Sequence, residues 1–451
     1  MRWHHGQSAP SAPRRITHRR CRHIDRTWTT DLASKAGAPV LLKGWLHRLR
    51  VLSNVTFLVL RDARGLAQVV VTDPRTRALL QTLHSESVLE VRGDAQAIEQ
   101  APNGVEVRSP LVTVLAKAAA PPPIELFRPL ATSSLPTLLD HAAVALRHPA
   151  RRSHFEMAAA ALHGFRSTLE SHGFTEINTP KIVGSATEGG ANVFKLDYFG
   201  RPAYLAQSPQ FYKQTLVGVF ERVFEVGPVF RAEPHDTPRH INEYVSLDIE
   251  MGFIEDHFTV MRMLREVVSG MLAAIAERAP AAVARLSKPP PEVPDEIPSL
   301  PFSQALELVG APPGEPDLAP AHETALGEWA LREHGSEFLF VTGYPLAKRP
   351  FYTHPDPSQP GASNSFDLLF RGLEMVTGGQ RLHLYQDYLR VLRERGLSAE
   401  PFAGYLEAFA YGMPPHGGFA IGLERFIARL AGVANIREVT LFPRDLNRVT
   451  P

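Results

Sequence analysis

The feature that most constrains the fold of this chain is a long hairpin that the sequence predicts between residues 223 and 251. An apolar stretch, 223–230, is followed by a polar loop and by a stretch, 244–251, in which apolar and polar residues alternate. Alternation with a period of two is typical of a strand with one buried face. Arg231 and Glu233 begin the loop, and His240 and Tyr244 stand on its return.

A second segment, GGFAIGLERF at 417–426, predicts a glycine-rich strand that passes directly into a helix. This turn would present Arg425 beside the end of the strand. Arg231 likewise directly follows a predicted strand, the first strand of the hairpin. Both arginines suit a polyphosphate, although either segment alone would also fit a solvated sheet edge. The chain has neither a P-loop motif nor a GxGxxG motif, so ATP chemistry would need another cradle.

Length and composition set the outer limits. At 451 residues the chain is too long for one compact core, so two or three domains are expected. A hydrophobic content of 44% without any run of about 18 apolar residues predicts a cytoplasmic protein with no membrane span. The single cysteine, Cys21, excludes an internal disulfide and a cysteine-based zinc cluster.

Residues 1–28 are a basic N-terminal extension, which we expect to be disordered. Seven arginines lie within residues 1–26, and no acidic residue precedes Asp25. Because the stretch has no apolar segment, it is not a secretory signal. An organellar transit peptide and a basic arm that touches RNA are the alternatives.

Residues 29–120 predict a small β-barrel. Five segments rich in valine, leucine and aromatics are separated by turn residues, and a helix at 75–83 follows the third of them: 40–49, 55–62, 65–73, 87–96 and 104–114. Five strands with a helix after the third is the plan of an OB-fold, which binds single-stranded nucleic acid. A generic five-stranded domain is the alternative.

The rest of the chain predicts a linker, 121–150, and a large domain, 151–451. Apolar residues at helical spacing predict a helix over 151–172 that stops at Gly173. A strand should follow, with Pro180 at an edge or a bend. Residues 279–320 are proline-dense and acidic, which predicts a surface insertion with little regular structure.

Six segments together resemble one family, the archaeal-type aspartyl-tRNA synthetases of class IIb, over residues 29–451. They are SATEGG (185–190), AQSPQFYKQ (206–214), FRAEPHDTPRHINEY (230–244), FDLLFRGLEMVTGGQRLH (366–383), YGMPPHGGFAIGLER (411–425) and LFPRD (441–445). The resemblance implies an α+β protein: an N-terminal OB-fold barrel that binds the anticodon and an antiparallel catalytic sheet flanked by helices. It further implies two-step aspartylation of tRNA and a homodimer built through the helix and strand around Pro180.

The resemblance assigns the ATP site. Arg231 would bridge the α-phosphate and the amino-acid carboxylate, and Arg425 would clamp the γ-phosphate. His240 would lie near the γ-phosphate, Tyr244 would stack on adenine, and Glu233 would lie near the adenine or the terminal adenosine of the tRNA. Such chemistry depends mostly on positioning and charge stabilisation, without a covalent protein nucleophile.

The resemblance also places Mg²⁺ at the triphosphate, with Asp367 and Glu374 as ligands. Mg²⁺ prefers a few carboxylates together with substrate phosphates. Thr377 stands where archaeal relatives often carry serine, and its hydroxyl would contact the metal or its waters. For an isolated acidic pair, a solvated surface is the alternative.

Lys213 and Arg381 match the family positions whose cations meet the side-chain carboxylate of aspartate. Arginine can hold that carboxylate with two parallel hydrogen bonds. Asparagine would leave the cations facing a neutral amide, and an unpaired buried charge costs about 3–5 kcal/mol. Asp248 would hold the substrate ammonium and Gln207 would line the pocket. A loop closing over aspartate would consist of Ser185, Glu188, Gly189 and Gly190.

On the barrel, Phe57, Gln68 and Arg50 match positions that read the central anticodon uridine. His47 and Pro102 resemble the pair found in non-discriminating relatives, which accept both tRNA(Asp) and tRNA(Asn). Asp-tRNA(Asn) would then feed a tRNA-dependent amidotransferase. The alternatives are a discriminating aspartyl enzyme, an asparaginyl- or lysyl-tRNA synthetase, and a non-catalytic RNA-binding paralogue.

Overall fold

A computed structural model describes residues 25–128, 133–184, 192–312 and 314–450 of the chain. It divides into two compact units, Met1–Phe127 and Arg128–Pro451. Most of the predicted N-terminal extension lies outside the described residues. Among the described residues, no helix is both long and apolar enough to cross a membrane.

The first unit is a closed barrel with the strand order β1–β2–β3–β5–β4, which confirms the predicted OB-fold. All its strand pairs are antiparallel except β3–β5, which is parallel. Side chains that alternate along the strands fill the interior. Its elements are β1 (Pro39–Val51), β2 (Thr56–Arg61), β3 (Leu66–Val71), α1 (Pro74–Gln81), β4 (Val88–Ala97), β5 (Val105–Ala116) and the 3₁₀ turns η1 (Thr29–Asp31), η2 (Ala33–Lys35) and η3 (Pro102–Gly104).

The second unit is built on an eight-stranded sheet with the order β12–β13–β14–β15–β16–β11–β10–β6. The six central strands are antiparallel, and the short edge strands β6 and β12 join in parallel. The bounds are β6 (Thr175–Glu176), β10 (Arg222–Phe230), β11 (Glu243–Gly252), β12 (Ser299–Pro301), β13 (Phe338–Thr342), β14 (Ser365–Phe370), β15 (Glu374–Gln380) and β16 (His416–Gly422).

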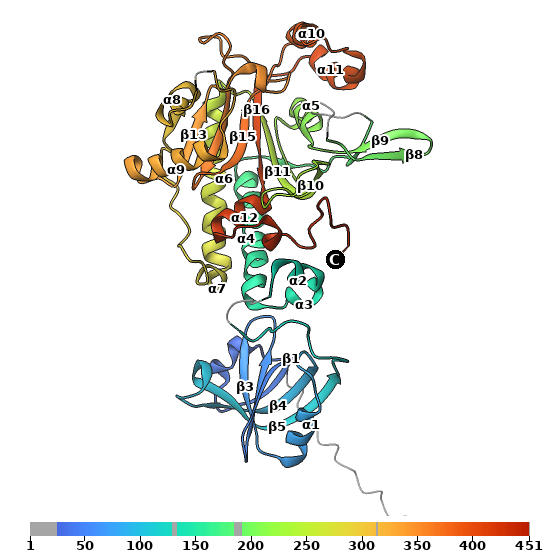
Figure 1. The fold of residues 1–451 in the computed structure, drawn as a ribbon, viewed down its shortest axis with the longest axis vertical. Helices are drawn as coiled ribbons and strands as arrows, with labels where there is room; N and C mark the ends of the chain where they lie inside the picture. Colours follow the sequence, from blue (N-terminus) through green and yellow to red (C-terminus); the bar gives the residue numbers. More distant parts are fainter. Residues whose placement is uncertain (1–24, 129–132, 185–191, 313, 451) are drawn as a thin grey trace, which may run out of the picture. The chain divides into compact units, whose positions relative to one another are not determined.

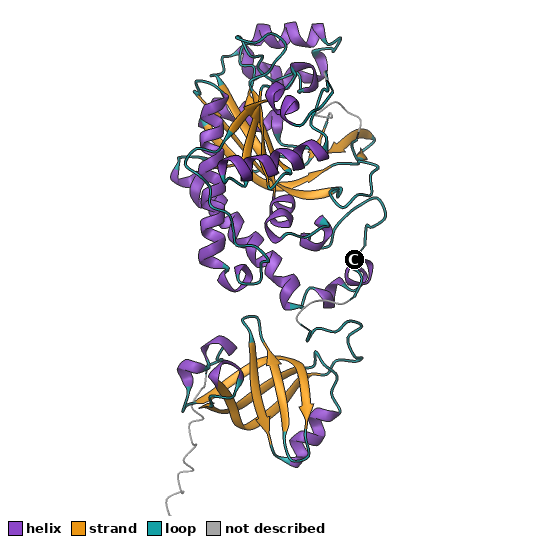
Figure 2. Ribbon diagram, turned by 60° about the vertical axis from the view of Figure 1, so that its left-hand side comes forward, coloured by secondary structure: helices purple, strands orange, loops and turns teal. Residues whose placement is uncertain are grey.

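Two long helices, α4 (Pro149–Ser171) and α6 (His257–Arg278), lie side by side against this sheet (Figure 1). They approach closely because glycines meet at their contact: a Cβ atom on Gly164 would lie 2.5 Å from the carbonyl oxygen of Gly270. Figure 2 shows further helices packed around the strands of the sheet. The other helices of this unit include α5 (Gln210–Phe220), α9 (Pro320–His334), α10 (Tyr385–Glu394), α11 (Ala403–Ala410) and α12 (Leu423–Ala431), with 3₁₀ turns η4 (Leu346–Lys348), η5 (Glu400–Phe402) and η6 (Ile436–Val439).

Three segments differ in detail from the sequence expectation. The expected linker 121–150 contains two short helices, α2 (Leu135–Asp140) and α3 (Ala142–Ala145), which belong to the second unit. The expected insertion 279–320 contains α7 (Pro280–Val283), β12 and α8 (Phe302–Leu308). Pro301 of this stretch is compatible with β12 because that strand lies at the edge of the sheet. There, a missing N–H interrupts no central strand pairing.

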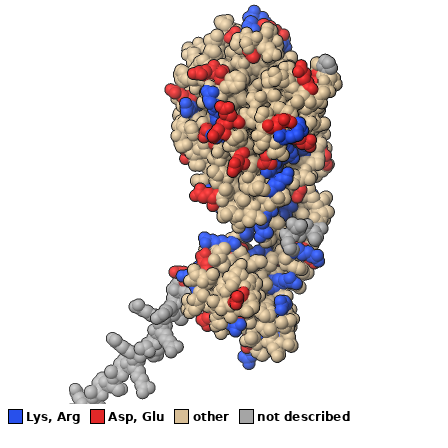
Figure 3. All heavy atoms as spheres, turned by 90° about the vertical axis from the view of Figure 1, so that its left-hand side faces the viewer, with Lys and Arg blue, Asp and Glu red and all other residues tan. Residues whose placement is uncertain are grey.

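The expected strand around Pro180 is interrupted. Its first part is β6, and its second part is β7 (Ile182–Val183), which joins a separate three-stranded sheet with β9 (Arg201–Leu205) and β8 (Lys195–Tyr198). Pro180 lies between the two strands, at the change of sheet. On the face drawn in Figure 3, acidic and basic side chains are interspersed.

Candidate active site

The predicted hairpin is formed by β10 and β11, which pair in antiparallel register up to Phe230 and Glu243. Arg231 follows directly, and its backbone N–H donates to the carbonyl of Asn242 at 2.9 Å. The Asn242 side chain donates to the carbonyl of Arg231 at 2.7 Å. Paired backbone groups on both sides thus fix the start of the loop that carries Arg231, Glu233 and His240.

The strand-to-helix turn is formed by β16 and α12, as the sequence predicted. Arg425 lies in the first turn of α12, and β16 lies between β11 and β15 in the sheet. This order brings Arg425 to Glu374, the first residue of β15. The Arg425 Nη1 atom lies 3.8 Å from the Glu374 carboxylate and donates to the Glu374 carbonyl at 3.3 Å.

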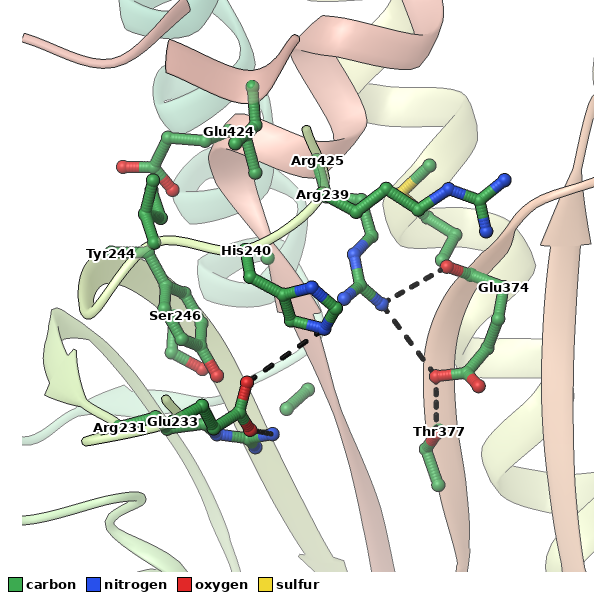
Figure 4. Close-up of a pocket in the computed structure, with 15 residues that line it drawn as sticks. Arg231, Glu233, Arg239, His240, Tyr244, Ser246, Glu374, Thr377, Glu424 and Arg425 are labelled. Atoms are coloured by element: carbon green, nitrogen blue, oxygen red, sulfur yellow. Dashed lines mark hydrogen bonds and ion pairs between the residues drawn. The ribbon is translucent and has the colours of Figure 1, made fainter. Parts of the chain in front are cut away.

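A pocket of about 220 Å³ opens between these elements (Figure 4). The predicted ATP-binding residues share it: its lining includes Arg231, Glu233, His240, Tyr244, Glu374 and Arg425, and also Thr377 of the predicted metal site. It also includes Arg239, which the sequence analysis did not single out although it stands beside His240. We refer to this cavity as the nucleotide pocket.

Charges in the nucleotide pocket are paired loosely. Arg231 lies 3.9 Å from the Glu233 carboxylate, with 40% of its side chain exposed. Its guanidinium also lies over the Tyr244 ring, 5.8 Å from the centroid. His240 lies 3.8 Å from Glu233, and partial burial lowers the pKa of His240 below its ordinary value.

The predicted metal ligands lie on paired strands, where Asp367 of β14 is opposite Thr377 of β15. Asp367 is buried and accepts a hydrogen bond from Arg349 at 2.9 Å. Burial raises the pKa of Glu374 to about 7, and the charge of Asp367 adds to this effect. Two adjacent carboxylates suit Mg²⁺, which takes its remaining ligands from phosphates and water. Among the described residues, no three histidine, cysteine or acidic side chains form a metal-binding cluster.

Glu323 of α9 is another carboxylate at this edge that sequence reasoning missed. It is buried and accepts the backbone N–H of Glu374 at 2.8 Å. Burial raises the pKa of Glu323 above its ordinary value. Neither Glu323 nor Arg349 stands in a segment that resembles a family motif, so only the three-dimensional structure connects them to Asp367 and Glu374.

Lys213 of α5 is almost fully enclosed, with 1% of its surface exposed. Its Nζ donates to Asp248 at 2.9 Å and to the carbonyls of Ile249 and Phe419 at 3.1 and 3.3 Å. Asp248 also accepts a hydrogen bond from Ser246 at 2.5 Å. Asp248, which the sequence assigned to the substrate ammonium, is therefore engaged with Lys213 and Ser246 in this structure.

Arg381 lies beyond the end of β15 with 7% of its surface exposed. Its Nε donates to Glu250 at 3.0 Å and its Nη2 to the carbonyl of Gly418 at 3.0 Å. The other Glu250 oxygen lies 3.4 Å from Lys213 Nζ, so Glu250 joins the two predicted aspartate-binding cations. Burial alone would raise the pKa of Glu250, but the charges of Arg381 and Lys213 outweigh it and hold that pKa below its ordinary value.

Sequence reasoning missed Glu250, although a signal was present. Asp248 and Glu250 are two residues apart on one strand, so both side chains emerge on the same face. Gly418 makes room for the charge cluster, because a Cβ atom there would collide with the Glu250 carboxylate. We call Lys213, Asp248, Glu250 and Arg381 the charge cluster.

A hydrogen-bonded network supports the charge cluster. Gln214, next to Lys213 in the sequence, donates to His416 Nε2 at 3.0 Å and contacts Tyr388 at 3.4 Å. The other His416 nitrogen contacts the carbonyl of Pro414 at 2.9 Å, which requires the Nδ1–H tautomer. Burial lowers the pKa of His416 to about 4, so the ring is neutral at neutral pH.

The nucleotide pocket and the charge cluster are contiguous, because Ser246 lines the pocket and also bonds to Asp248. Gln207 is buried and donates to the carbonyl of Asn192 at 3.3 Å. The predicted closing loop, Ser185, Glu188, Gly189 and Gly190, lies outside the described residues. The site thus places a pocket lined by arginines beside a buried charge cluster.

On the barrel, three predicted anticodon residues lie on neighbouring strands. Arg50 pairs with Phe57 across β1 and β2, and its guanidinium lies 5.1 Å from the Phe57 ring centroid. Gln68 of β3 donates to Glu106 of β5 at 3.0 Å. Such a partly exposed aromatic beside a cation suits stacking of a nucleobase.

The predicted specificity pair lies in two different settings. His47 is 6% exposed, stands at an irregularity of β1, and lies 3.4 Å from Arg61 Nη1. Pro102 is exposed and begins η3, between β4 and β5. The assignment of both residues to the third anticodon base stays a prediction.

Comparison with known proteins agrees with this geometry. The family "tRNA synthetases class II (D, K and N)" matches residues 134–446, and "OB-fold nucleic acid binding domain" matches residues 40–115. The aspartate–tRNA(Asp/Asn) ligase of Thermus thermophilus is 46% identical and that of Deinococcus radiodurans 44%. These matches cover 94% and 95% of this chain and 100% and 99% of the relatives.

Solved structures show the same architecture. Asparaginyl-tRNA synthetase of Pyrococcus horikoshii, complexed with asparaginyl-adenylate, superposes with a TM-score of 0.88 at 29% identity, covering 95% of this chain and all of the other. Aspartyl-tRNA synthetase of Entamoeba histolytica superposes with a TM-score of 0.83 at 30% identity, covering 95% and 93%. The chain therefore belongs to the class II tRNA synthetases, within the family of the aspartate–tRNA(Asp/Asn) ligases.

Proposed function

We propose that this chain activates L-aspartate with ATP and transfers it to tRNA(Asp) and tRNA(Asn). In the first step a carboxylate oxygen of aspartate attacks the α-phosphorus of ATP, and diphosphate leaves. In the second step a ribose hydroxyl at the 3′ end of the tRNA attacks the carbonyl carbon of the adenylate, and AMP leaves. The observation that carries the proposal is the contiguity of the nucleotide pocket with the charge cluster.

Arg231 and Arg425 are the residues suited to the first step. They enter the nucleotide pocket from different elements, the loop after β10 and the first turn of α12. Two cations at separate points would orient the triphosphate and stabilise the charge that grows on its oxygens as the new bond forms. The partly exposed Tyr244 ring offers the adenine a surface for stacking.

Asp367 and Glu374, with the Thr377 hydroxyl, would hold Mg²⁺. When bound, Mg²⁺ would neutralise phosphate charge. Arg349 and Arg425 compensate the charges of this carboxylate pair only in part, which fits the raised pKa of Glu374, about 7. Titration of the protein with Mg²⁺ should therefore release protons near pH 7, and this can be followed by calorimetry in two buffers.

Selection of aspartate follows from the cations of the charge cluster. Lys213 and Arg381 would meet a second carboxylate on the substrate, Lys213 by exchanging one of the three contacts that its ammonium makes with Asp248 and two backbone carbonyls. The amide of asparagine brings no charge to that place. Aspartate-dependent exchange of diphosphate into ATP tests this directly. Turnover of asparagine at a comparable rate would instead support the asparaginyl alternative, and absence of exchange with any amino acid would support a non-catalytic paralogue.

Use of both tRNAs is supported by His47 and Pro102 and by the names of the relatives. One mismatched base contact is worth about 1–3 kcal/mol, so a looser pocket for the third anticodon base could remove the preference. Aspartylation of tRNA(Asp) and tRNA(Asn) should be compared side by side. A preference of about a hundredfold or more for tRNA(Asp) would contradict this proposal, and the double variant H47W/P102K should create such a preference.

We also propose a homodimer through α4 and the segment around Pro180, the elements to which the family resemblance assigns the interface. Obligate interfaces of this kind commonly bury about 2,000 Å² or more in total. Light scattering at micromolar concentration tests it, and an active, stable monomer would contradict it. If tRNA(Asn) is charged, the product must pass to an amidotransferase that converts the attached aspartate. Coexpression with such an enzyme should yield Asn-tRNA(Asn).

A further inference from the structure

The loop that carries Arg231, Glu233 and His240 is held by a segment near the C-terminus, of which only Ile436 lines the nucleotide pocket. We define the loop as residues 231–242 and the C-terminal segment as residues 435–448. Two backbone bonds join them: Ile436 N–H donates to the Pro238 carbonyl at 2.9 Å, and Asn242 N–H donates to the Arg444 carbonyl at 2.7 Å. The two stretches are about 200 residues apart in the sequence, as the partners Thr237 and Arg437 show.

Arg437 is the centre of the contact. It is 6% exposed, which is unusual for an arginine. Its guanidinium donates to Asp445 at 2.5 Å within the C-terminal segment. It also donates to Asp236 at 2.8 Å and to the Thr237 carbonyl at 3.0 Å, both in the loop. A rigid, fork-shaped donor set of this kind fixes the positions of all its acceptors at once.

Asp236 is held by a second donor. One of its oxygens accepts from Arg437 and the other accepts from the Asn447 side chain at 2.8 Å. Asp236 itself has a half-exposed side chain, 52%, and the pocket lining does not include it. It is therefore an attachment point of the loop and not a wall of the nucleotide pocket.

The attachment reaches the pocket through two short connections. Thr237, whose carbonyl Arg437 holds, contacts the His240 ring with its hydroxyl at 2.6 Å. Asn242, whose N–H is bonded to the Arg444 carbonyl, donates from its side chain to the carbonyl of Arg231 at 2.7 Å. His240 and Arg231 both line the nucleotide pocket. The C-terminal segment therefore holds Thr237 and Asn242, the two residues whose side chains contact His240 and Arg231.

We propose that the C-terminal segment is a clamp that holds the loop in its ATP-binding conformation, with Asp236 and Arg437 as positioning residues. Without the clamp the loop would have to be ordered by ATP itself, and the entropy of ordering would weaken ATP binding. Binding of the amino acid would be affected less, because only its contact with Arg231 lies on the loop, whereas Lys213 and Arg381 lie on other elements. This inference rests on the proposed function only in taking ATP as the ligand of the pocket.

The variant Asp236→Ala tests the clamp. Because its side chain is half exposed, the protein should still fold. Loss of the charge-assisted hydrogen bond should raise the Kd for ATP, measured by calorimetry without amino acid, roughly tenfold. In diphosphate exchange the KM for ATP should rise by a similar factor, while the KM for aspartate stays within about twofold.

A matched control is Asp140→Ala. Asp140 is also an exposed carboxylate, 59%, and it also holds the C-terminal segment, through Arg448 at 2.7 Å. It makes that contact from α2 and not from the loop, so ATP affinity should not change. An ATP Kd for Asp236→Ala within twofold of the parent, or an equal loss in Asp140→Ala, would overturn the proposal.

Asn447→Ala separates positioning from general destabilisation. The Asn447 side chain acts through its bond to Asp236, so the double variant should lose little more ATP affinity than Asp236→Ala alone. Full additivity would contradict a common clamp. Failure of the aspartate proposal would appear differently, as normal ATP binding without aspartate-dependent exchange in the parent protein.

Discussion

The nucleotide pocket and the charge cluster share Ser246 but treat their cations in opposite ways. Lys213 and Arg381 are 1% and 7% exposed and lie 2.9–3.4 Å from their carboxylate partners. Arg231 and Arg425 have 40% and 36% of their side chains exposed and lie 3.9 and 3.8 Å from theirs. One half of the site is closed by its own charges, and the other half is open to a ligand.

The difference follows from what each half has to recognise. A small amino acid offers few contacts, so discrimination needs cations that are fixed before it arrives and that cannot relax around a neutral analogue. A triphosphate brings several charges and can itself order partly exposed arginines. Exposed pairs contribute only about 0–1 kcal/mol to stability, whereas removing one partner of a buried pair costs about 3–5 kcal/mol. The two halves should therefore respond differently to substitution.

The largest effect is expected for Lys213→Leu. The change removes the ammonium from between Asp248 and Glu250, leaving buried carboxylates with Arg381 and Ser246 as partners, so the free energy of unfolding should fall by about 3–5 kcal/mol. Aspartate-dependent exchange should be almost abolished while ATP affinity is retained. Urea unfolding and calorimetry with ATP measure the two effects, and a variant that activates aspartate like the parent would contradict the assignment.

Arg425→Ala should show the reverse pattern. Removing one charge-stabilising group commonly costs about 10²–10³ in rate, so kcat for exchange should fall by that order. The free energy of unfolding should change by less than about 1 kcal/mol, since the Arg425–Glu374 pair is partly exposed. A large loss of stability would show that Arg425 behaves like the buried cations Lys213 and Arg381.

The half that contains the charge cluster should also make stability depend on pH, because His416 supports it. Its pKa is lowered to about 4 in the folded protein from an ordinary 6.5. The unfolded chain therefore binds the proton more readily, so this contribution is complete above pH 6.5 and is lost as pH falls toward 4. The slope is about 1.4 kcal/mol per pH unit.

The variant His416→Gln isolates that contribution, because its amide can keep a hydrogen bond but does not titrate. Glu424, with a pKa raised to about 7 by burial, contributes the opposite slope and is present in both proteins. The free energy of unfolding of both proteins is measured with urea at pH 7 and pH 5. Relative to the variant, the parent should lose stability between these two pH values, because only the parent carries His416. Equal slopes would mean that His416 does not stay neutral in the folded state.

The smallest effect is expected for Glu233→Gln. Its contacts with Arg231 and His240 are 3.9 and 3.8 Å long, so the free energy of unfolding should change by no more than about 0.5 kcal/mol. Any change in activity would then report on ligand contacts and not on folding. A loss above about 2 kcal/mol would erase the contrast between the two halves.

Local patterns predicted the barrel strands, the β10–β11 hairpin and the β16–α12 turn, because period-two alternation and glycine placement act over short distances. The resemblance then predicted which side chains would share the nucleotide pocket. It did not reveal Glu250, whose carboxylate pairs with Lys213 of α5 and with Arg381, which follows β15. That partnership exists only once the sheet order is known.

Contacts between distant segments were likewise outside the reach of the sequence. Arg349 and Glu323 come from regions that resemble no motif, and the Arg437–Asp236 bond joins the end of the chain to a loop near its middle. The short strand β12 within the proline-rich stretch was missed because its pairing with β13 supplies the order that its composition lacks. Local propensity is a weak guide wherever tertiary partners determine the structure.

The bridge that Glu250 makes between Lys213 and Arg381 also bears on how such a site can evolve. A lineage that changed its amino acid by replacing one cation would leave Glu250 undercompensated, and that intermediate would be less stable by about 3–5 kcal/mol. The total free energy of unfolding of a natural protein is only about 5–15 kcal/mol. A switch of amino acid would therefore require either a prior reserve of stability or a nearly simultaneous change at a second position, so the chemistry of this pocket resists gradual drift.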